Sequence, residues 1–66
     1  MSIVKVIEVI SEGKTLEEAI NSGVEEAAKT VQDIKQINVS HIEGVVEKNK
    51  VTKFRVNSKV SFVVKH

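Results

Sequence analysis

Two side chains of the types that bind metals, His41 and Glu43, stand two residues apart in the second half of the chain. On an extended strand, residues two apart point to the same face, so the imidazole and the carboxylate lie side by side. A closed metal site needs about four ligands, and this pair supplies only half of them. We interpret the pair as solvated or interface residues. It becomes a candidate divalent-cation site only where symmetry-related chains multiply it.

A second group of carboxylates has the oxygen chemistry that calcium prefers: Glu17, Glu18, Glu25 and Glu26. The segment Thr15-Leu16-Glu17-Glu18 also fits a capping box, in which the Thr15 hydroxyl accepts the Glu18 amide and the Glu18 carboxylate reaches back. Acidic side chains in the first turn of a helix suit the positive end of its dipole. The cap therefore explains Glu18 and the dipole explains Glu17 without a cation.

No residue pattern in the chain predicts catalysis. There is no cysteine, no serine–histidine–acid spacing, no glycine-rich phosphate loop and no strand-turn nucleophile elbow. The net charge of +1 and the single arginine give no electrostatic argument for nucleic acid. The apolar runs are far shorter than the ~20 residues that span a membrane. We expect a non-enzymatic cytoplasmic protein with neither a nucleic acid nor a membrane as partner.

Two long strands within residues 34–64, folded back at 47–50, must position the candidate side chains. From Val51 onward the alternation is strict, and it predicts a strand with one buried face. One face carries Thr52, Phe54, Val56, Ser58, Val60, Phe62 and Val64. The partner strand alternates more loosely, with Ile37 and Val39 on the face opposite to Gln36, Asn38 and Ser40. We expect Glu43-Gly44 to bend or bulge this strand, because glycine weakens pairing.

The first half of the chain predicts a strand over residues 2–10, a loop over 11–14 and a helix that begins at Thr15. In the loop, Gly13 is free to adopt a positive φ. The helix carries an apolar stripe of Leu16, Ala19, Ile20, Gly23, Val24, Ala27 and Val31. We expect Gly23 to let the helix lie close to the sheet, and Asp33 to mark the exit. The order is β-α-β-β, an α+β fold with one helix on a three-stranded, largely antiparallel sheet.

The size of the chain favours self-association. Its 66 residues form one domain, 1–66, and a chain of this length buries only about 60% of its unfolded surface. No disulfide is available to stabilise it, because the chain has no cysteine. The long hairpin also exceeds what one short helix covers. We therefore expect a homo-oligomer.

Order, spacing and length together make the chain similar to the dodecins. The matching segments are Val4-Lys5-Val6-Ile7-Glu8-Val9-Ile10, Thr15-Leu16-Glu17-Glu18-Ala19, Ala27-Ala28-Lys29-Thr30-Val31, Asp33-Ile34-Lys35 and Phe54-Arg55-Val56-Asn57-Ser58-Lys59-Val60-Ser61-Phe62. The resemblance implies a sheet that partly wraps one helix. It also implies a hollow homododecamer that stores or sequesters a flavin, such as riboflavin or FMN, between subunits.

The resemblance also identifies candidate ligand residues. In flavin-binding dodecins, a tryptophan early in the second strand stacks on the flavin ring and a glutamine on the third strand bonds its polar edge. The matching positions here are Gln36 and Arg55, and Asn38 lies on the same face as Gln36. Because the tryptophan is replaced, we expect weak flavin binding or none. The chain thus resembles the dodecins that lack this tryptophan, some of which bind calcium, so a divalent cation is the alternative ligand.

Overall fold

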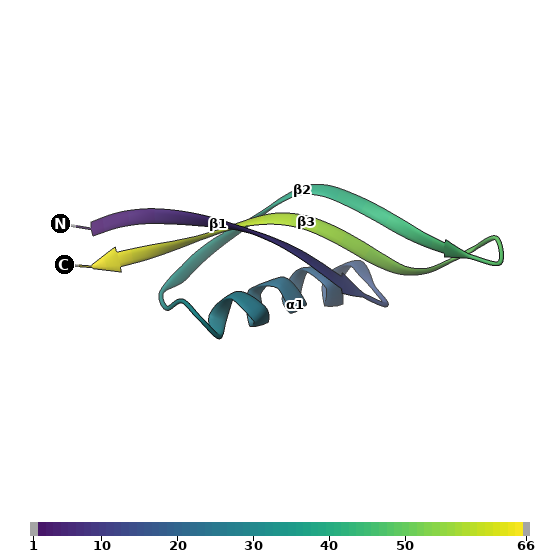
Figure 1. Ribbon diagram of the computed structural model, residues 1–66, viewed down its shortest axis with the longest axis horizontal. Coiled ribbons are helices and arrows are strands. Elements are labelled where there is room, and N and C mark those ends of the chain that lie inside the picture. Colours follow the sequence, from purple (N-terminus) through teal and green to yellow (C-terminus); the bar gives the residue numbers. More distant parts are fainter. Residues whose placement is uncertain (1, 66) are drawn as a thin grey trace.

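The computed structural model describes residues 2–65, which form three strands and one helix. The elements are β1 (Ser2–Gly13), α1 (Leu16–Ala28), β2 (Ile34–Glu47) and β3 (Lys50–Lys65). The strand order in the sheet is β1-β3-β2, and both pairs of neighbours are antiparallel. Figure 1 shows α1 lying along one face of the curved sheet. The predicted β-α-β-β order and the three-stranded antiparallel sheet are confirmed.

The core lies between α1 and the face of the sheet that it covers. Its buried apolar side chains are Ala19, Ala27, Val56, Val60 and Phe62. The alternation predicted for β3 places its buried residues on this face. Gly23 is buried at the contact, where an added Cβ would lie 3.0 Å from Ser11 Oγ and 3.4 Å from Val9 Cγ2. The close approach of helix and sheet at Gly23 is thus confirmed.

The start of α1 is fixed by Thr15. The Glu18 amide donates to Thr15 Oγ1 at 3.1 Å, which satisfies one of the free amides of the first turn. The Glu18 carboxylate does not accept a hydrogen bond from the Thr15 amide, as the capping box predicted. The Thr15 hydroxyl donates to Glu18 Oε2 instead, at 3.4 Å. The predicted cap is confirmed, with a different second contact.

The end of α1 comes earlier than the apolar stripe predicts, so Val31 lies outside the helix. The Thr30 and Val31 amides donate to the Ala27 carbonyl, and the Thr30 hydroxyl also donates to it at 3.3 Å. These bonds close the last turn. Asp33 then adopts a φ of 58°, and its carbonyl accepts the Val63 amide at 3.1 Å. The predicted exit at Asp33 is therefore a left-handed turn tied to β3.

The first strand continues three residues beyond its predicted end. Ser11, Glu12 and Gly13 stay paired in register with Val56, Arg55 and Phe54, so the loop predicted over residues 11–14 was wrong for most of its length. Gly13 has no positive φ. Its role is a close approach, because an added Cβ would lie 2.5 Å from the Ala19 amide nitrogen.

The β2–β3 hairpin turns where predicted, at Lys48 and Asn49, whose φ values are 51° and 65°. Two left-handed residues make a tight turn that matches the twist of the strands. The bulge predicted at Glu43-Gly44 was wrong, because both residues pair in register with β3. The register shifts occur instead at Lys35, Ser40 and Thr52, which have no partner in the β2–β3 pairing.

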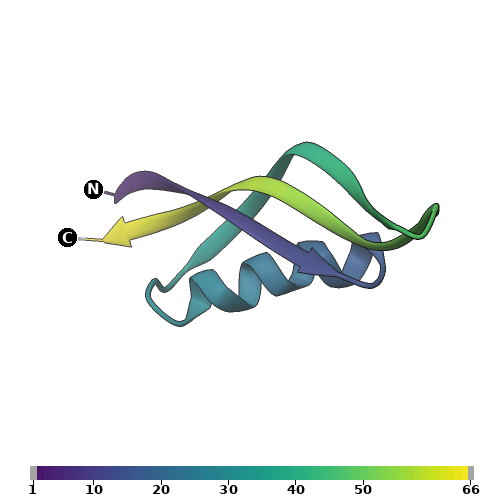
Figure 2. The ribbon, with the colours of Figure 1, turned by 45° about the vertical axis from the view of Figure 1, so that its right-hand side comes forward.

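The molecule is elongated, with extents of 52 × 19 × 14 Å. In Figures 1 and 2 the turn of the hairpin projects well beyond the end of α1. Its accessible surface is 5017 Å², whereas a compact monomer of 7.3 kDa exposes about 4,200 Å². This excess of accessible surface shows that much of the sheet lies uncovered.

The described part of the chain has no helix that is long and apolar enough to cross a membrane.

Candidate functional site

The face of the sheet opposite α1, which we call the outer face, carries the candidate ligand residues of the strands: Gln36, Asn38, His41, Glu43 and Arg55. Opposite residues of an antiparallel pair project to the same face. Arg55 pairs with Glu12 of β1 and with Glu43 of β2, and Lys59 pairs with Glu8 and Asn38. The register also places these outer-face residues together with Val4, Val6, Ile10, Gln36, His41 and Ser61.

Gln36 and Arg55 share the outer face but lie far apart on it. Gln36 is opposite Ser61 of β3, so the two positions are separated by six residues of that strand. At about 3.3 Å per residue this is about 20 Å. The structure therefore places both side chains on the predicted face and does not bring them together within one chain. Asn38, opposite Lys59, lies near Gln36.

Arg55 is bound by a residue that the sequence did not single out, Glu12. Arg55 Nε donates to Glu12 Oε2 at 2.8 Å, and Arg55 Nη2 lies 2.7 Å from the same oxygen. Lys53 Nζ donates to the other carboxylate oxygen at 2.9 Å. The Lys53 and Arg55 hydrogen bonds hold the pKa of Glu12 below its ordinary value of 4.5. Glu12 thus stays ionised and fixes Arg55 against the end of β1.

A charge pattern would have pointed to Glu12. Glu8 and Glu12 are four residues apart on β1, and Arg55 and Lys59 are four apart on β3. An antiparallel pairing that matches these charges gives the observed register. Opposite charges across strands stabilise a sheet, so the pattern indicates the pairing. The pairing of Glu12 with Arg55 was missed because β1 was predicted to end at Ile10, which placed Glu12 in a loop.

The metal candidates form two separate groups, one on the outer face of the sheet and one on α1. His41 lies opposite Asn57, and Glu43 lies opposite Arg55, both on the outer face. On α1, Glu18 contacts the cap and Glu26 Oε2 lies 3.0 Å from Lys29 Nζ. Across residues 2–65, no three histidine or acidic side chains gather closely enough to hold a metal ion.

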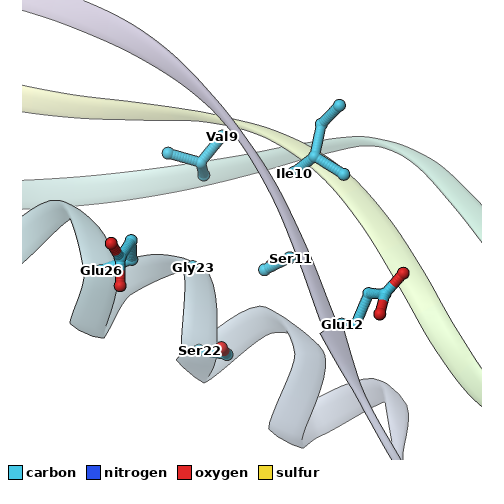
Figure 3. Close-up of a pocket in the computed structure, with 7 residues that line it drawn as sticks. All are labelled: Val9, Ile10, Ser11, Glu12, Ser22, Gly23 and Glu26. Atoms are coloured by element: carbon cyan, nitrogen blue, oxygen red, sulfur yellow. The ribbon is translucent and has the colours of Figure 1, made fainter.

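An open hollow of about 510 Å³ lies between the free edge of β1 and α1, and none of the candidate ligand residues on β2 and β3 lines it. Its lining comprises Val9, Ile10, Ser11, Glu12, Ser22, Gly23 and Glu26. Figure 3 shows Ser11 directed toward α1 and Glu12 directed away from it. The Ser11 hydroxyl already donates to the Ala19 carbonyl at 2.6 Å, so its bond serves packing.

Comparison with known proteins gives the same fold. Dodecin of Thermus thermophilus, in a variant form, has 24% identity over 100% of both chains and a TM-score of 0.91. Dodecin from Streptomyces davaonensis has 18% identity, covers 98% of this chain and 97% of its own, and has a TM-score of 0.90. Dodecin from Streptomyces coelicolor has 21% identity, with 98% and 94% covered and a TM-score of 0.90.

These identities establish the fold alone, and none of the curated proteins matches the chain. The sequence model of the dodecin family, however, matches residues 3–65, nearly the whole chain. Its members are small flavin-binding proteins, a non-enzymatic family whose homologues are oligomeric. The chain belongs to the dodecin family.

Proposed function

We propose that this chain, a single dodecin-like domain over residues 1–66, assembles into a hollow homododecamer in the cytoplasm. The assembly binds and stores a small molecule, such as riboflavin or FMN, in sites between subunits. It catalyses no reaction. Gln36, Asn38 and Arg55 line the site, and flavin affinity is low because Gln36 stands where flavin-binding relatives carry tryptophan.

The observation that carries this proposal is the composition of the outer face. Val4, Val6 and Ile10 are 63%, 53% and 68% exposed, and they share the face with the polar candidate residues. Apolar side chains with a few polar groups among them are typical of ligand sites and of the surfaces that enclose them. No element of the described chain covers this face.

A second subunit supplies what one chain lacks. The separation of about 20 Å along β3 keeps Gln36 and Arg55 of one chain from contacting the same small ligand. A neighbouring subunit can pack its outer face against that of the first chain, with the two β3 strands running in opposite directions. Its Arg55 then lies near the Gln36 of the first chain. The excess surface of the monomer supports such an assembly.

Low affinity follows from the side chains available. The absence of an aromatic ring weakens the binding free energy by about 1–3 kcal/mol, by analogy with bases that stack on aromatic residues. Gln36 offers amide hydrogen bonds instead. Arg55 can stack on a flat ring, but its guanidinium is held by Glu12.

The test measures mass and flavin binding on the same sample. Light scattering after size exclusion should give about twelve times 7.3 kDa, and the fluorescence anisotropy of riboflavin should rise when this species is added at micromolar concentrations. A folded monomer at micromolar concentration contradicts the assembly. A dodecamer that leaves the riboflavin anisotropy unchanged at saturating protein contradicts the flavin site.

A divalent cation such as calcium is the second candidate, and the local charge disfavours it. Glu43 lies opposite Arg55, whose positive charge opposes a cation at that position. His41 and Glu43 would need ligands from neighbouring subunits to complete a site. Calorimetric titration of the apo assembly with calcium tests this alternative.

A further inference from the structure

The part of β2 that carries Gln36 and Asn38 lies between two β-bulges. Residues 36–39 pair with residues 61–58 of β3 without interruption, and the register shifts fall at Lys35 before them and at Ser40 after them. In a bulge, two residues of one strand lie opposite a single residue of its partner, which bends the bulged strand and increases its twist. In Figures 1 and 2, β2 arches along its middle. The bulges therefore contribute to the direction in which this short segment runs.

Ser40 is the extra residue of the second bulge, and its side chain is bound. Its two neighbours in β2 pair with consecutive residues of β3, Ser58 and Asn57, so Ser40 has no partner of its own. The Ser40 hydroxyl donates to the Asn57 carbonyl at 3.0 Å. Because β3 is the middle strand of the sheet, this bond ties the bulge to the centre of the sheet.

The bulge at Ser40 also keeps the outer face of β2 continuous. The outer-face residues have even numbers before Ser40 and odd numbers after it: Gln36 and Asn38, then His41 and Glu43. Strict alternation from Asn38 would direct His41 and Glu43 inward. The extra residue shifts the alternation by one, so the candidate residues on both sides of the bulge share one face.

We propose that Ser40 is a positioning residue for the proposed ligand site. Its bulge and its bond to the Asn57 carbonyl set how Gln36 and Asn38 project from the outer face. Supporting residues must hold a binding side chain within about 0.5 Å of its working position. Ser40 is two residues from Asn38 on the same strand, so a change in the bulge displaces the site directly. This inference rests on the proposed function, in which Gln36 and Asn38 line the site.

Two deletions form a matched pair. Deletion of Ser40 removes its bulge and keeps every observed pairing, because its neighbours already pair with consecutive residues. Deletion of Thr52 is the control: Thr52 is the extra residue of a bulge in β3, and its hydroxyl is 3.3 Å from the Val45 carbonyl oxygen. Thr52 is nine residues along β3 from Ser61, the partner of Gln36, which is about 30 Å. Both deletions remove a bulge and a side-chain bond, but only one lies beside the site.

The readout is a tryptophan placed at the site. Gln36→Trp gives the chain a single tryptophan, and the chain has no tyrosine. In this background and without ligand, deletion of Ser40 should shift the emission maximum and change the quenching by acrylamide, whereas deletion of Thr52 should change neither. With riboflavin added, deletion of Ser40 should lower the affinity about tenfold and deletion of Thr52 by less than about twofold.

Two substitutions test the hydroxyl at constant chain length, so the test does not depend on how well the deletion variant folds. Ser40→Ala loses the bond to the Asn57 carbonyl and should shift the emission in the same direction as the deletion. Ser40→Thr retains a hydroxyl and should restore the emission and the riboflavin affinity of the Gln36→Trp background. Thermal unfolding of each variant separates lost affinity from lost stability.

The outcomes separate this inference from the proposed function. If riboflavin binds and neither deletion of Ser40 nor Ser40→Ala changes the emission or the affinity, Ser40 has no positioning role and the site stands. An equal effect from deletion of Thr52 also overturns the inference, because the bulge at Ser40 then has no special relation to the site. If riboflavin binds to no variant, the flavin site is wrong, and the tryptophan emission alone decides whether Ser40 sets the direction of position 36.

Discussion

Arg55 is held by Glu12 across the β1–β3 pair, with both Nε and Nη2 within 2.8 Å of one carboxylate oxygen. The contact ties the end of β1 to the base of the hairpin and orients the one arginine of the chain. Lys53 binds the other oxygen, and Glu43 lies opposite Arg55 from β2. The two acidic and two basic groups balance one another. The part of the outer face near Arg55 therefore offers little net attraction to an anionic ligand.

Removing the Glu12 charge should change ligand preference. Glu12→Gln releases Arg55 and leaves an excess of positive charge, so affinity for FMN should rise several-fold relative to riboflavin, which lacks the phosphate. Glu8→Gln, on the same strand and face, is the control. Fluorescence titration of both variants with both flavins measures the ratio. An equal ratio of FMN affinity to riboflavin affinity in the two variants would show that Glu12 does not limit the interaction of Arg55 with ligands.

The same ion pairs predict a pH dependence of stability. The pKa of Glu12 is lowered in the folded chain by its bonds to Lys53 and Arg55, so the ionised carboxylate favours folding. This contribution is complete above the ordinary pKa of 4.5 and is lost as pH falls through the lower folded value. The difference in melting temperature between wild type and Glu12→Gln should therefore shrink as the pH falls below 4.5. A constant difference from pH 7 to pH 3 would contradict the assignment.

Thr15 should matter through its cap and not through any ligand. Thr15→Ala removes the acceptor of the Glu18 amide and should reduce the free energy of unfolding by about 1 kcal/mol. Ligand affinity of the assembly should stay within a factor of two. Chemical denaturation and ligand titration of the same preparation check this. Lost binding with unchanged stability would assign Thr15 to a site.

Two buried serines should respond oppositely to the same substitution. Ser58 is buried, and its hydroxyl has no hydrogen-bond partner within the described part of the chain. An unpaired buried hydroxyl costs about 1–3 kcal/mol, so Ser58→Ala should leave stability unchanged or raise it. Ser11→Ala removes the bond to the Ala19 carbonyl and should lower stability by about 1 kcal/mol. Equal losses in both variants would mean that Ser58 has a partner.

Local signals predicted the fold well. The cap at Thr15, the turn at Lys48-Asn49 and the alternation along β3 each depend on neighbouring residues. The end of β1 and the bulges at Ser40 and Thr52 depend on partners far away in sequence. Thr52 illustrates the difference: its side chain is stabilised by contacts across the hairpin, and nothing in residues 51–53 signals them.

The sequence predicted which face of the sheet carries the candidate residues, but it did not predict how far apart they lie. Alternation alone places Gln36 and Arg55 on one side of the sheet. Their separation depends on the register of β2 against β3, which the skipped residues shift. Glu12 was missed because its role requires the pairing of β1 with β3. A site shared between subunits also depends on symmetry that one sequence does not contain.

Riboflavin titration of wild type and of the variant that combines Gln36→Trp with Arg55→Gln tests whether the missing tryptophan limits flavin binding. Gln36→Trp restores an aromatic plane, and Arg55→Gln removes the charged side chain and supplies an amide. We expect weak quenching by wild type and an affinity at least tenfold higher, with deeper quenching, for the double variant. Nanomolar binding by wild type would contradict the role of the missing tryptophan. A double variant that binds no better than wild type would contradict the site itself.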